Sequence, residues 1–165
     1  MSVTAIGLGS NLGNRLLNLR TAVRFLTETP RRDKNRLIKA SEVFETEPWG
    51  VPDQPHFLNA CLIIENLSPP EDLLVRVKEI EAEMGRTATR RWGERKIDID
   101  ILFMDCIVYD SADLRIPHTD MHRRDFVLIP LAQVAPHWVH PLTKRTVSEM
   151  ASDFRDRSLV RVCGL

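Results

Sequence analysis

The sequence has no excess of charge of either sign, few cysteines and no long apolar run. Its 23 basic and 23 acidic side chains balance, so net charge indicates neither a nucleic-acid nor a membrane partner. The three cysteines are odd in number and far apart, which argues against a disulfide framework or a zinc ribbon and favours a reducing compartment. No apolar stretch approaches the roughly 18 residues of a membrane span, and no secretory signal is visible. We therefore expect a cytoplasmic protein.

The length and composition are those of one globular domain. Hydrophobic residues make up 43% of the 165-residue chain and charged residues 28%. A chain of this size buries about two-thirds of its unfolded surface, enough for a real core. The sequence has no internal repeat and no low-complexity tract, so we expect a single domain over residues 1–165.

Hydrophobic periodicity predicts an α+β domain. Strands are expected at residues 3–8, 37–46, 57–65, 97–103 and 159–162. Helices are expected after the polar turn at 9–14, over 68–85 and 120–135, and from a capping box at 146–149. The order strand, helix, strand, strand, helix, strand, followed by a mainly helical tail, predicts a ferredoxin-like antiparallel sheet with helices packed on it.

Local signals set the expected helix ends. Ser68 is predicted to be the N-cap of the second helix, within a capping box, and Gly85 its C-terminal glycine. Asp120 is predicted to cap the third helix. Gly7, Gly9 and Gly13 lack the Gly-Lys-[Ser/Thr] ending of a P-loop, so they are interpreted as strand-to-helix turn residues.

The segment with the strongest chemical signal is a basic loop followed by an acidic strand. Five arginines and lysines lie between residues 86 and 96, and Asp98 and Asp100 follow them. In a strand these two carboxylates share one face, about 7 Å apart along the backbone, while the isoleucines between them pack on the other face. Such a pair suits Mg²⁺ bound together with substrate phosphates. The alternative interpretation is that both aspartates are solvated and paired with the neighbouring arginines.

Four segments together resemble one enzyme family. They follow one another in the expected order over nearly the whole chain, which is far more specific than any single motif. The segment 91–102 resembles the signature of the 6-hydroxymethyl-7,8-dihydropterin pyrophosphokinases, and the other matching segments are residues 9–13, 53–60 and 116–121.

The resemblance implies a reaction. Members of this family move the β,γ-pyrophosphate of ATP to the hydroxymethyl group of the pterin, a step of folate biosynthesis, and release AMP. The hydroxyl oxygen attacks the β-phosphorus in line, so catalysis is expected to depend mostly on positioning and charge neutralisation. Two Mg²⁺ ions are implied, held by Asp98 and Asp100. No protein base is required, because the metals lower the pKa of the attacking hydroxyl.

The resemblance also implies roles for individual residues. The catalytic residues implied are Arg86, Arg95, Asp98 and Asp100, with the two arginines on a loop that closes over the site. The residues implied near the nucleotide are Glu81, Trp92, Ile101, His118 and Arg124. The pterin contacts implied are Thr46, Trp49, Asn59 and two ring-sandwiching aromatics, Phe57 and Phe126. Glu81 is equally well explained by an ion pair with Lys78, one helical turn away.

The chain departs from the family pattern in the basic loop. That loop is one residue shorter, and Ala88 stands where a second arginine is common, a loss for which Arg90 or Arg91 could compensate. These departures concern the grip on ATP and leave the metal pair intact.

Three alternatives remain open at the level of sequence. A nucleotidyltransferase also combines Gly-Ser with Asp-x-Asp, but Ser10 and Asp98 are 88 residues apart here. A catalytically silent binding module would keep the pocket without turnover, yet no expected catalytic residue is missing. A transition-metal site at His118 and His122 is disfavoured by Pro117, which opposes a helix there. The expected partners are small-molecule substrates, not nucleic acid or membrane, and the expected oligomeric state is a monomer.

Overall fold

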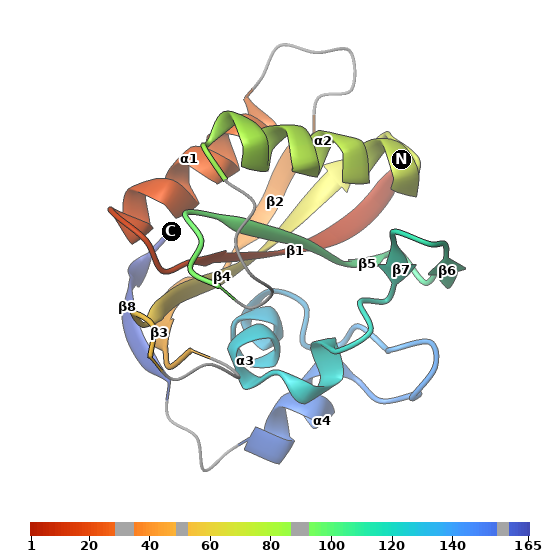
Figure 1. The fold of residues 1–165 in the computed structure, drawn as a ribbon. Helices are drawn as coiled ribbons and strands as arrows, with labels where there is room; N and C mark the ends of the chain where they lie inside the picture. Colours follow the sequence, from red (N-terminus) through yellow and green to blue (C-terminus); the bar gives the residue numbers. More distant parts are fainter. Residues whose placement is uncertain (29–34, 49–52, 87–92, 155–158) are drawn as a thin grey trace.

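The computed structural model describes residues 1–28, 35–48, 53–86, 93–154 and 159–165 (Figure 1). The strands are β1 (Ser2–Ser10), β2 (Arg36–Ala40), β3 (Glu42–Thr46), β4 (Phe57–Asn66), β5 (Asp98–Met104), β6 (Tyr109–Asp110), β7 (Arg115–Ile116) and β8 (Val160–Gly164). The helices are α1 (Arg15–Thr27), α2 (Pro70–Glu83), α3 (Asp125–Val134) and α4 (Val147–Ala151), with 3₁₀ turns at Met121–Arg123 and Ser152–Phe154. Within these residues no helix is long and apolar enough to cross a membrane.

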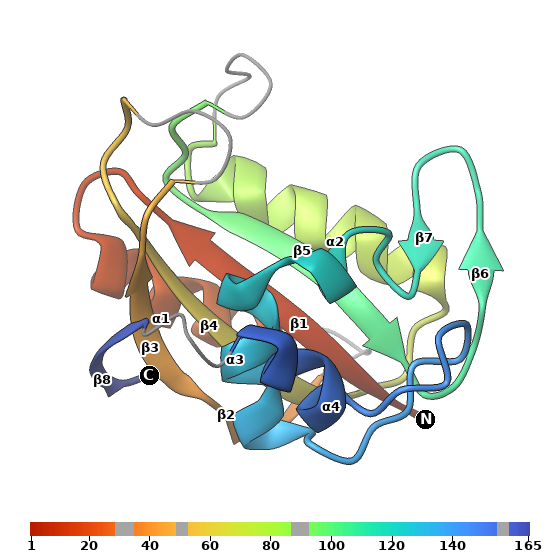
Figure 2. The ribbon, with the colours of Figure 1, turned by 90° about the horizontal axis from the view of Figure 1, so that it is seen from below.

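The main sheet has the topology expected from the order of the elements. Its strands are arranged β5-β1-β4-β3-β8, and β2 also pairs with β4. Every pairing in this sheet is antiparallel. The first four of these strands give the ferredoxin-like arrangement, so the predicted α+β fold class is confirmed. The short strands β6 and β7 pair with each other and project beside the end of β5 (Figure 2).

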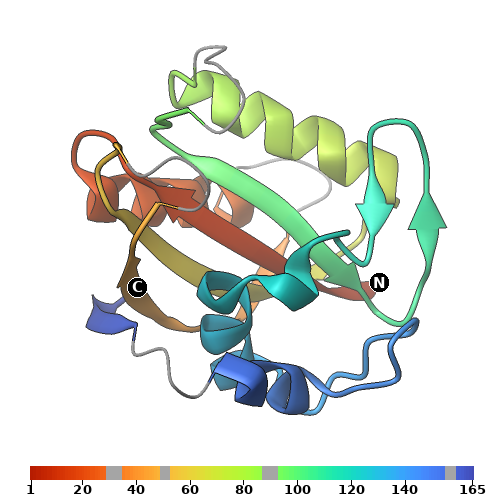
Figure 3. The same ribbon diagram turned by 60° about the horizontal axis from the view of Figure 1, so that its bottom comes forward.

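Helices cover both faces of the sheet. The helices α1 and α2 pack on one face, and α3 and α4 pack on the other (Figures 1 and 3). Two separate clusters of buried side chains result. The first cluster joins Ile6 and Leu62 of the sheet to Ile80 of α2, and the second joins Cys61 of the sheet to Leu128 of α3. The helical tail, whose position the sequence did not fix, therefore forms the third layer.

Side-chain alternation along the central strands agrees with the prediction. In β4, Leu62 and its alternate neighbours belong to the α1/α2 core, whereas Cys61 and Ile63 belong to the α3/α4 core. Ile97, just before β5, and Ile99 and Ile101 within it all belong to the α1/α2 core. The intervening aspartates are therefore directed to the face on which α3 packs.

One expected strand is divided into two. The prediction of a continuous strand over residues 37–46 is wrong, because the chain breaks at Ser41 between β2 and β3. The Ser41 hydroxyl accepts a hydrogen bond from Cys61 N (2.8 Å), and Ser41 N donates to Cys61 O (2.9 Å). A side chain thus replaces a backbone acceptor in the sheet, and the register of the strand shifts there.

Two predicted N-caps are wrong. The helix α2 starts after Pro69, and Ser68 makes no capping bond; its backbone instead exchanges hydrogen bonds with the Asn66 side chain. Asp120 precedes only a 3₁₀ turn, and its carboxylate accepts from Arg124 (3.3 Å) instead of capping α3. The predictions at the other ends are confirmed: Gly85 has φ +82° after α2, and a complete capping box starts α4.

Candidate active site

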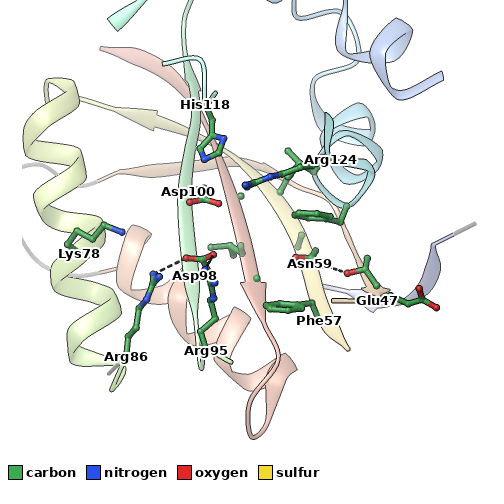
Figure 4. A pocket seen from close by; sticks show the side chains of 18 residues that line it. Glu47, Phe57, Asn59, Lys78, Arg86, Arg95, Asp98, Asp100, His118 and Arg124 are labelled. Atoms are coloured by element: carbon green, nitrogen blue, oxygen red, sulfur yellow. Dashed lines mark hydrogen bonds and ion pairs between the residues drawn. The ribbon is translucent and has the colours of Figure 1, made fainter. Parts of the chain in front are cut away.

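A cavity of about 280 Å³ opens on the sheet face that carries α3. Three strands form its floor, namely β1, β4 and β5, and side chains from α2 and from the start of α3 form its walls (Figure 4). Ten of the residues predicted for the site line it: Thr46, Phe57, Asn59, Arg86, Arg95, Asp98, Asp100, His118, Arg124 and Phe126. Two others, Trp49 and Trp92, lie outside the described residues.

Two glycines of β1 form the middle of the floor. Gly9 pairs with Asp98 on one side and with Asn59 on the other, and Gly7 pairs in the same way with Asp100 and Cys61. The absence of two side chains opens a path across the sheet from the acidic strand to the asparagine. A Cβ atom added at Gly9 would lie 3.1 Å from the Asn59 Oδ1 atom.

The interpretation as turn residues is therefore wrong for Gly7 and Gly9, which lie inside β1. It is confirmed for Gly13, which lies in the turn before α1 with φ +66°. The sequence did contain a signal: two glycines two residues apart in a strand fall on the same face and leave that face bare. That signal was missed because the flanking polar residues also fit a turn.

Asp98 is held by two guanidinium groups. Arg86 Nη1 donates to Asp98 Oδ1 at 2.8 Å, and Arg95 Nη1 donates to Asp98 Oδ2 at 2.5 Å (Figure 4). All three side chains are less than one-third exposed, so water screens these pairs only in part. The ion-pair alternative considered for the sequence is thus realised at Asp98, but at the wall of an open cavity.

Asp100 is placed differently from Asp98. It faces the cavity, and among the residues that the structure describes no side chain bonds it as Arg86 and Arg95 bond Asp98. Burial among protein atoms, and next the charge of Asp98, raise the pKa of the Asp100 carboxyl to about 7. The acid pair is therefore electrostatically costly when both carboxyls are ionised, and a cation bound between them would remove that cost.

Glu81 lies beneath the cavity instead of lining it. Its side chain is 3% exposed and accepts from Lys78 Nζ (2.9 Å), from Ile99 N (2.9 Å) and from Arg86. The predicted ion pair with Lys78 is confirmed. Glu81 thus joins α2 to β5 and orients Arg86 toward Asp98.

Ile101 also lies away from the cavity. Its side chain is 3% exposed and packs in the α1/α2 core, on the opposite face of the sheet from Asp100. The strand alternation that turns the aspartates toward the cavity turns the isoleucine away from it. The Ile101 side chain therefore does not line the cavity, and the implied place of this residue beside the nucleotide stays a prediction.

His118 and Arg124 stand on the other side of the acid pair (Figure 4). Burial, and next the charge of Arg124, lower the pKa of the His118 imidazole, so this ring is neutral at pH 7. His122 does not join it; instead its ring lies 6.3 Å from that of His140, in an edge contact. Within the described ranges no group of three or more His, Cys, Asp or Glu side chains could hold a metal by itself.

The far end of the cavity is suited to a flat polar ring. The side chains of Phe57 and Phe126 line it there. Asn59 is 7% exposed, and its Nδ2 donates to Thr46 Oγ1 at 2.6 Å, which leaves Asn59 Oδ1 as an acceptor near Gly9. A buried amide with a fixed orientation can form hydrogen bonds to the edge of a flat ring that stacks on the aromatic side chains.

The cavity also contains residues that sequence reasoning did not assign. The main ones are Lys78, seen beforehand only as a partner of Glu81, and the Cys61 thiol at the floor. Burial raises the pKa of Cys61, which keeps it a neutral thiol, and its Sγ lies 3.6 Å from Val127 O. Which residues of α2 and α3 reach the floor depends on how the helices dock, which periodicity does not reveal.

The fold is α+β, and the cavity gathers cationic side chains beside an acid pair, an arrangement suited to an anionic ligand. Residues 5–136 match the family of 7,8-dihydro-6-hydroxymethylpterin-pyrophosphokinases (HPPK). The chain belongs to this family.

Relatives of similar length support the assignment. The chain is 35% identical over 162 residues to the 2-amino-4-hydroxy-6-hydroxymethyldihydropteridine pyrophosphokinase of Haemophilus influenzae, covering 98% of this chain and 99% of the relative. It is 38% identical, with the same coverage, to the protein of that name from Methylorubrum extorquens.

Solved structures show the same fold. A crystal structure of an HPPK-DHPS chain in complex with substrates matches with a TM-score of 0.74 at 14% identity, over 94% of this chain and 46% of that chain. A Plasmodium falciparum HPPK-DHPS variant matches with a TM-score of 0.74 at 17% identity, over 94% and 44%. This chain therefore spans slightly less than half of those two-part chains.

Proposed function

We infer that this chain transfers the pyrophosphoryl group of ATP to the hydroxymethyl group of 6-hydroxymethyl-7,8-dihydropterin. The products are AMP and the pterin diphosphate, and the reaction is a step of folate biosynthesis. Membership of the pyrophosphokinase family carries this conclusion. The cavity supports it, because cationic and acidic side chains gather at one end and aromatic and amide side chains at the other.

The acid pair fits magnesium ions, and we propose two, held by Asp98 and Asp100. The chemistry of the donors supports this, because the two carboxylates share one face of a rigid strand. Without a bound cation, burial and mutual repulsion make it unfavourable for both carboxyls to be ionised at once. Other protein ligands are not required, since Mg²⁺ commonly keeps water and substrate phosphate oxygens. When bound, the ions would neutralise phosphate charge and lower the pKa of the attacking hydroxyl.

We propose that the arginines exchange partners when the nucleotide binds. Arg86 and Arg95 now occupy both oxygens of Asp98. Phosphate oxygens are also strong guanidinium acceptors, so a triphosphate in the cavity would attract both side chains and free the Asp98 carboxylate. The ion pairs on Asp98 are then the resting state of a metal site.

At the acceptor end we propose that the pterin lies between Phe57 and Phe126. Asn59 Nδ2 already donates to Thr46 Oγ1, so the Asn59 Oδ1 atom near Gly9 is the proposed acceptor for the ring edge. His118 and Arg124 are proposed nucleotide contacts on the opposite wall. This arrangement would hold the hydroxymethyl oxygen near the triphosphate, which is the main task of an enzyme for in-line phosphoryl transfer. The proposed roles of Trp49 and Trp92 rest on the resemblance alone.

The remaining proposals concern the protein as a whole. We propose that residues 1–165 form one pterin pyrophosphokinase domain that acts as a cytoplasmic monomer, without nucleic-acid or membrane partners. The three cysteines, all free, support a reducing compartment.

Product analysis tests the proposed function. The protein is incubated with ATP, Mg²⁺ and the hydroxymethyl pterin, and the products are separated by chromatography and identified by mass. Formation of AMP together with a pterin carrying two phosphates is the expected result. Free pyrophosphate together with a nucleotidylated acceptor would instead establish a nucleotidyltransferase, and binding without turnover would establish a silent module.

A further inference from the structure

Asn11 is a buried polar residue to which the proposed function gives no role. It follows the last residue of β1, is 1% exposed, and does not line the cavity. Burying a carboxamide is unfavourable unless its polar groups find partners in the protein. The partners of Asn11 therefore indicate what this side chain does.

On one side Asn11 holds the main chain of Arg95. Arg95 N donates to Asn11 Oδ1 at 2.8 Å, and Asn11 N donates to Arg95 O at 3.1 Å. The strand pairing of β1 with β5 ends at Gly9 and Asp98, so these two bonds extend the connection beyond the sheet. The Arg95 guanidinium, which bonds Asp98, is thus carried by a main chain that Asn11 fixes.

On the other side the same carboxamide holds the segment that leads into β4. Asn11 Nδ2 donates to Gln54 Oε1 at 3.2 Å and to Pro55 O at 3.3 Å. Phe57, the first residue of β4, follows this segment and lines the acceptor end of the cavity. Arg95 and Phe57 lie on either side of β1 (Figure 4). One buried side chain therefore connects the segments that carry the two ends of the cavity.

We propose that Asn11 is a positioning residue, which fixes the main chain of Arg95 relative to the start of β4. The proposal rests on the proposed function, in which Arg95 belongs to the nucleotide end and Phe57 to the pterin end. In-line transfer depends on the relative placement of donor and acceptor, and a misplacement of about 1 Å can lower the rate about a hundredfold. A carboxamide suits this task because it accepts a hydrogen bond on one side and donates on the other.

Two substitutions at Asn11 separate its contacts. Asn11→Ala removes the side-chain bonds on both sides. Asn11→Asp is nearly isosteric and keeps an acceptor for Arg95 N, but a carboxylate cannot donate to Gln54 Oε1 or to Pro55 O. Should Asn11→Ala fail to fold, Asn11→Ser takes its place.

The matched control is Asn66→Ala, at the opposite end of β4 from Phe57. Asn66 is also buried, and its side chain likewise bonds main-chain groups. Its Nδ2 donates to Ser68 O at 2.8 Å, and its Oδ1 accepts from Ser68 N at 3.0 Å. Because this residue lies away from the cavity, Asn66→Ala reports what a loss of stability alone does to turnover.

Each variant is compared with the parent in three measurements. AMP formation gives kcat and the KM values for ATP and the pterin. NMR gives the hydrogen-exchange rate of the Arg95 amide, which reports whether its main chain is held. Urea unfolding gives the stability, and circular dichroism confirms that the protein is folded under the assay conditions.

Asn11→Ala should lower kcat at least about tenfold with smaller changes in both KM values, because each substrate keeps its contacts while their alignment is lost. Its Arg95 amide should exchange at least about tenfold faster than in the parent. Asn11→Asp should keep that amide protected and have a kcat between those of Asn11→Ala and the parent. Asn66→Ala should be less stable in urea and keep the kcat of the parent.

Two results for a folded Asn11→Ala protein would overturn the proposal, namely the kcat of the parent or an unchanged exchange rate of the Arg95 amide. An equal loss of kcat in Asn66→Ala would also overturn it, since stability and not position would then be the cause. A parent protein without turnover would refute the proposed function instead. The exchange rate of the Arg95 amide would still show whether Asn11 holds this main chain.

Discussion

Replacing Arg95 by glutamine should strengthen the binding of a divalent cation to the nucleotide-free protein. The Arg95 guanidinium lies 2.5 Å from Asp98 Oδ2, with both side chains about one-fifth exposed. A hydrogen bond between charged groups of this burial contributes about 1.5–3 kcal/mol. A cation that binds Asp98 must displace it, so its removal should improve cation affinity by about tenfold, the lower end of that range.

Manganese(II) is a suitable probe, because the spin resonance signal of the free ion disappears on binding. The parent, Arg95→Gln and Asp98→Asn proteins are titrated without nucleotide, and Asp98→Asn should abolish the tight site. Lys78→Met is the matched control, since it removes one positive charge from the same cavity without a bond to Asp98. Its manganese affinity should rise less than about threefold, through long-range charge alone.

Two results would refute this reasoning. One is a folded Arg95→Gln protein whose manganese affinity equals that of the parent or is weaker. The other is an equal gain in Lys78→Met, which would show that overall charge, and not occupation of the Asp98 carboxylate, limits metal binding. Arg95→Gln should at the same time weaken the non-hydrolysable ATP analogue, because the same guanidinium is proposed to move to its phosphates.

Three further predictions follow from the floor of the cavity. Asp98→Ala and Asp100→Ala should each nearly abolish turnover with an unchanged circular dichroism spectrum; near-normal turnover by either variant contradicts the metal assignment. Because the folded-state pKa of Asp100 is raised to about 7, its contribution to stability is lost as pH rises from about 4 through 7. Asp100→Asn should therefore raise the free energy of unfolding of metal-free protein at pH 8 by at least about 1 kcal/mol and leave it unchanged near pH 4; urea unfolding that shows no difference at pH 8 would exclude the buried-charge argument. Gly9→Ala places a Cβ 3.1 Å from Asn59 Oδ1, so the KM for the pterin should rise about fivefold while the KM for ATP changes little. An equal rise of both KM values would contradict the proposal that the pterin lies over Gly9 beside Asn59.

Much of the fold could be predicted from the sequence because alternation is a local property. The faces of β4 and β5 follow from their apolar residues alone, and the observed cores agree with them. The order of elements was enough for the ferredoxin-like sheet. The errors fall where a single side chain competes with the backbone, as Ser41 does within the sheet and Asn66 before α2.

The candidate site was predictable only in part. The acid pair was found because its spacing put both carboxylates on one face of one strand, and the resemblance supplied the rest, Asn59 included. Glu81 and Ile101 were also assigned to the nucleotide, but one lies beneath the cavity and the other in the opposite core. A motif matched along the chain does not specify the depth at which each side chain is buried.

The sequence by itself determined most of the elements, the face on which Asp98 and Asp100 lie, and the family to which the chain belongs. Tertiary structure decided that two glycines of β1 separate those acids from Asn59, that guanidinium groups occupy Asp98, and that Lys78 reaches the same cavity. The physical reason is that periodicity fixes directions within one strand or helix. Contacts between elements depend on register and docking, which only the packing of the whole chain sets.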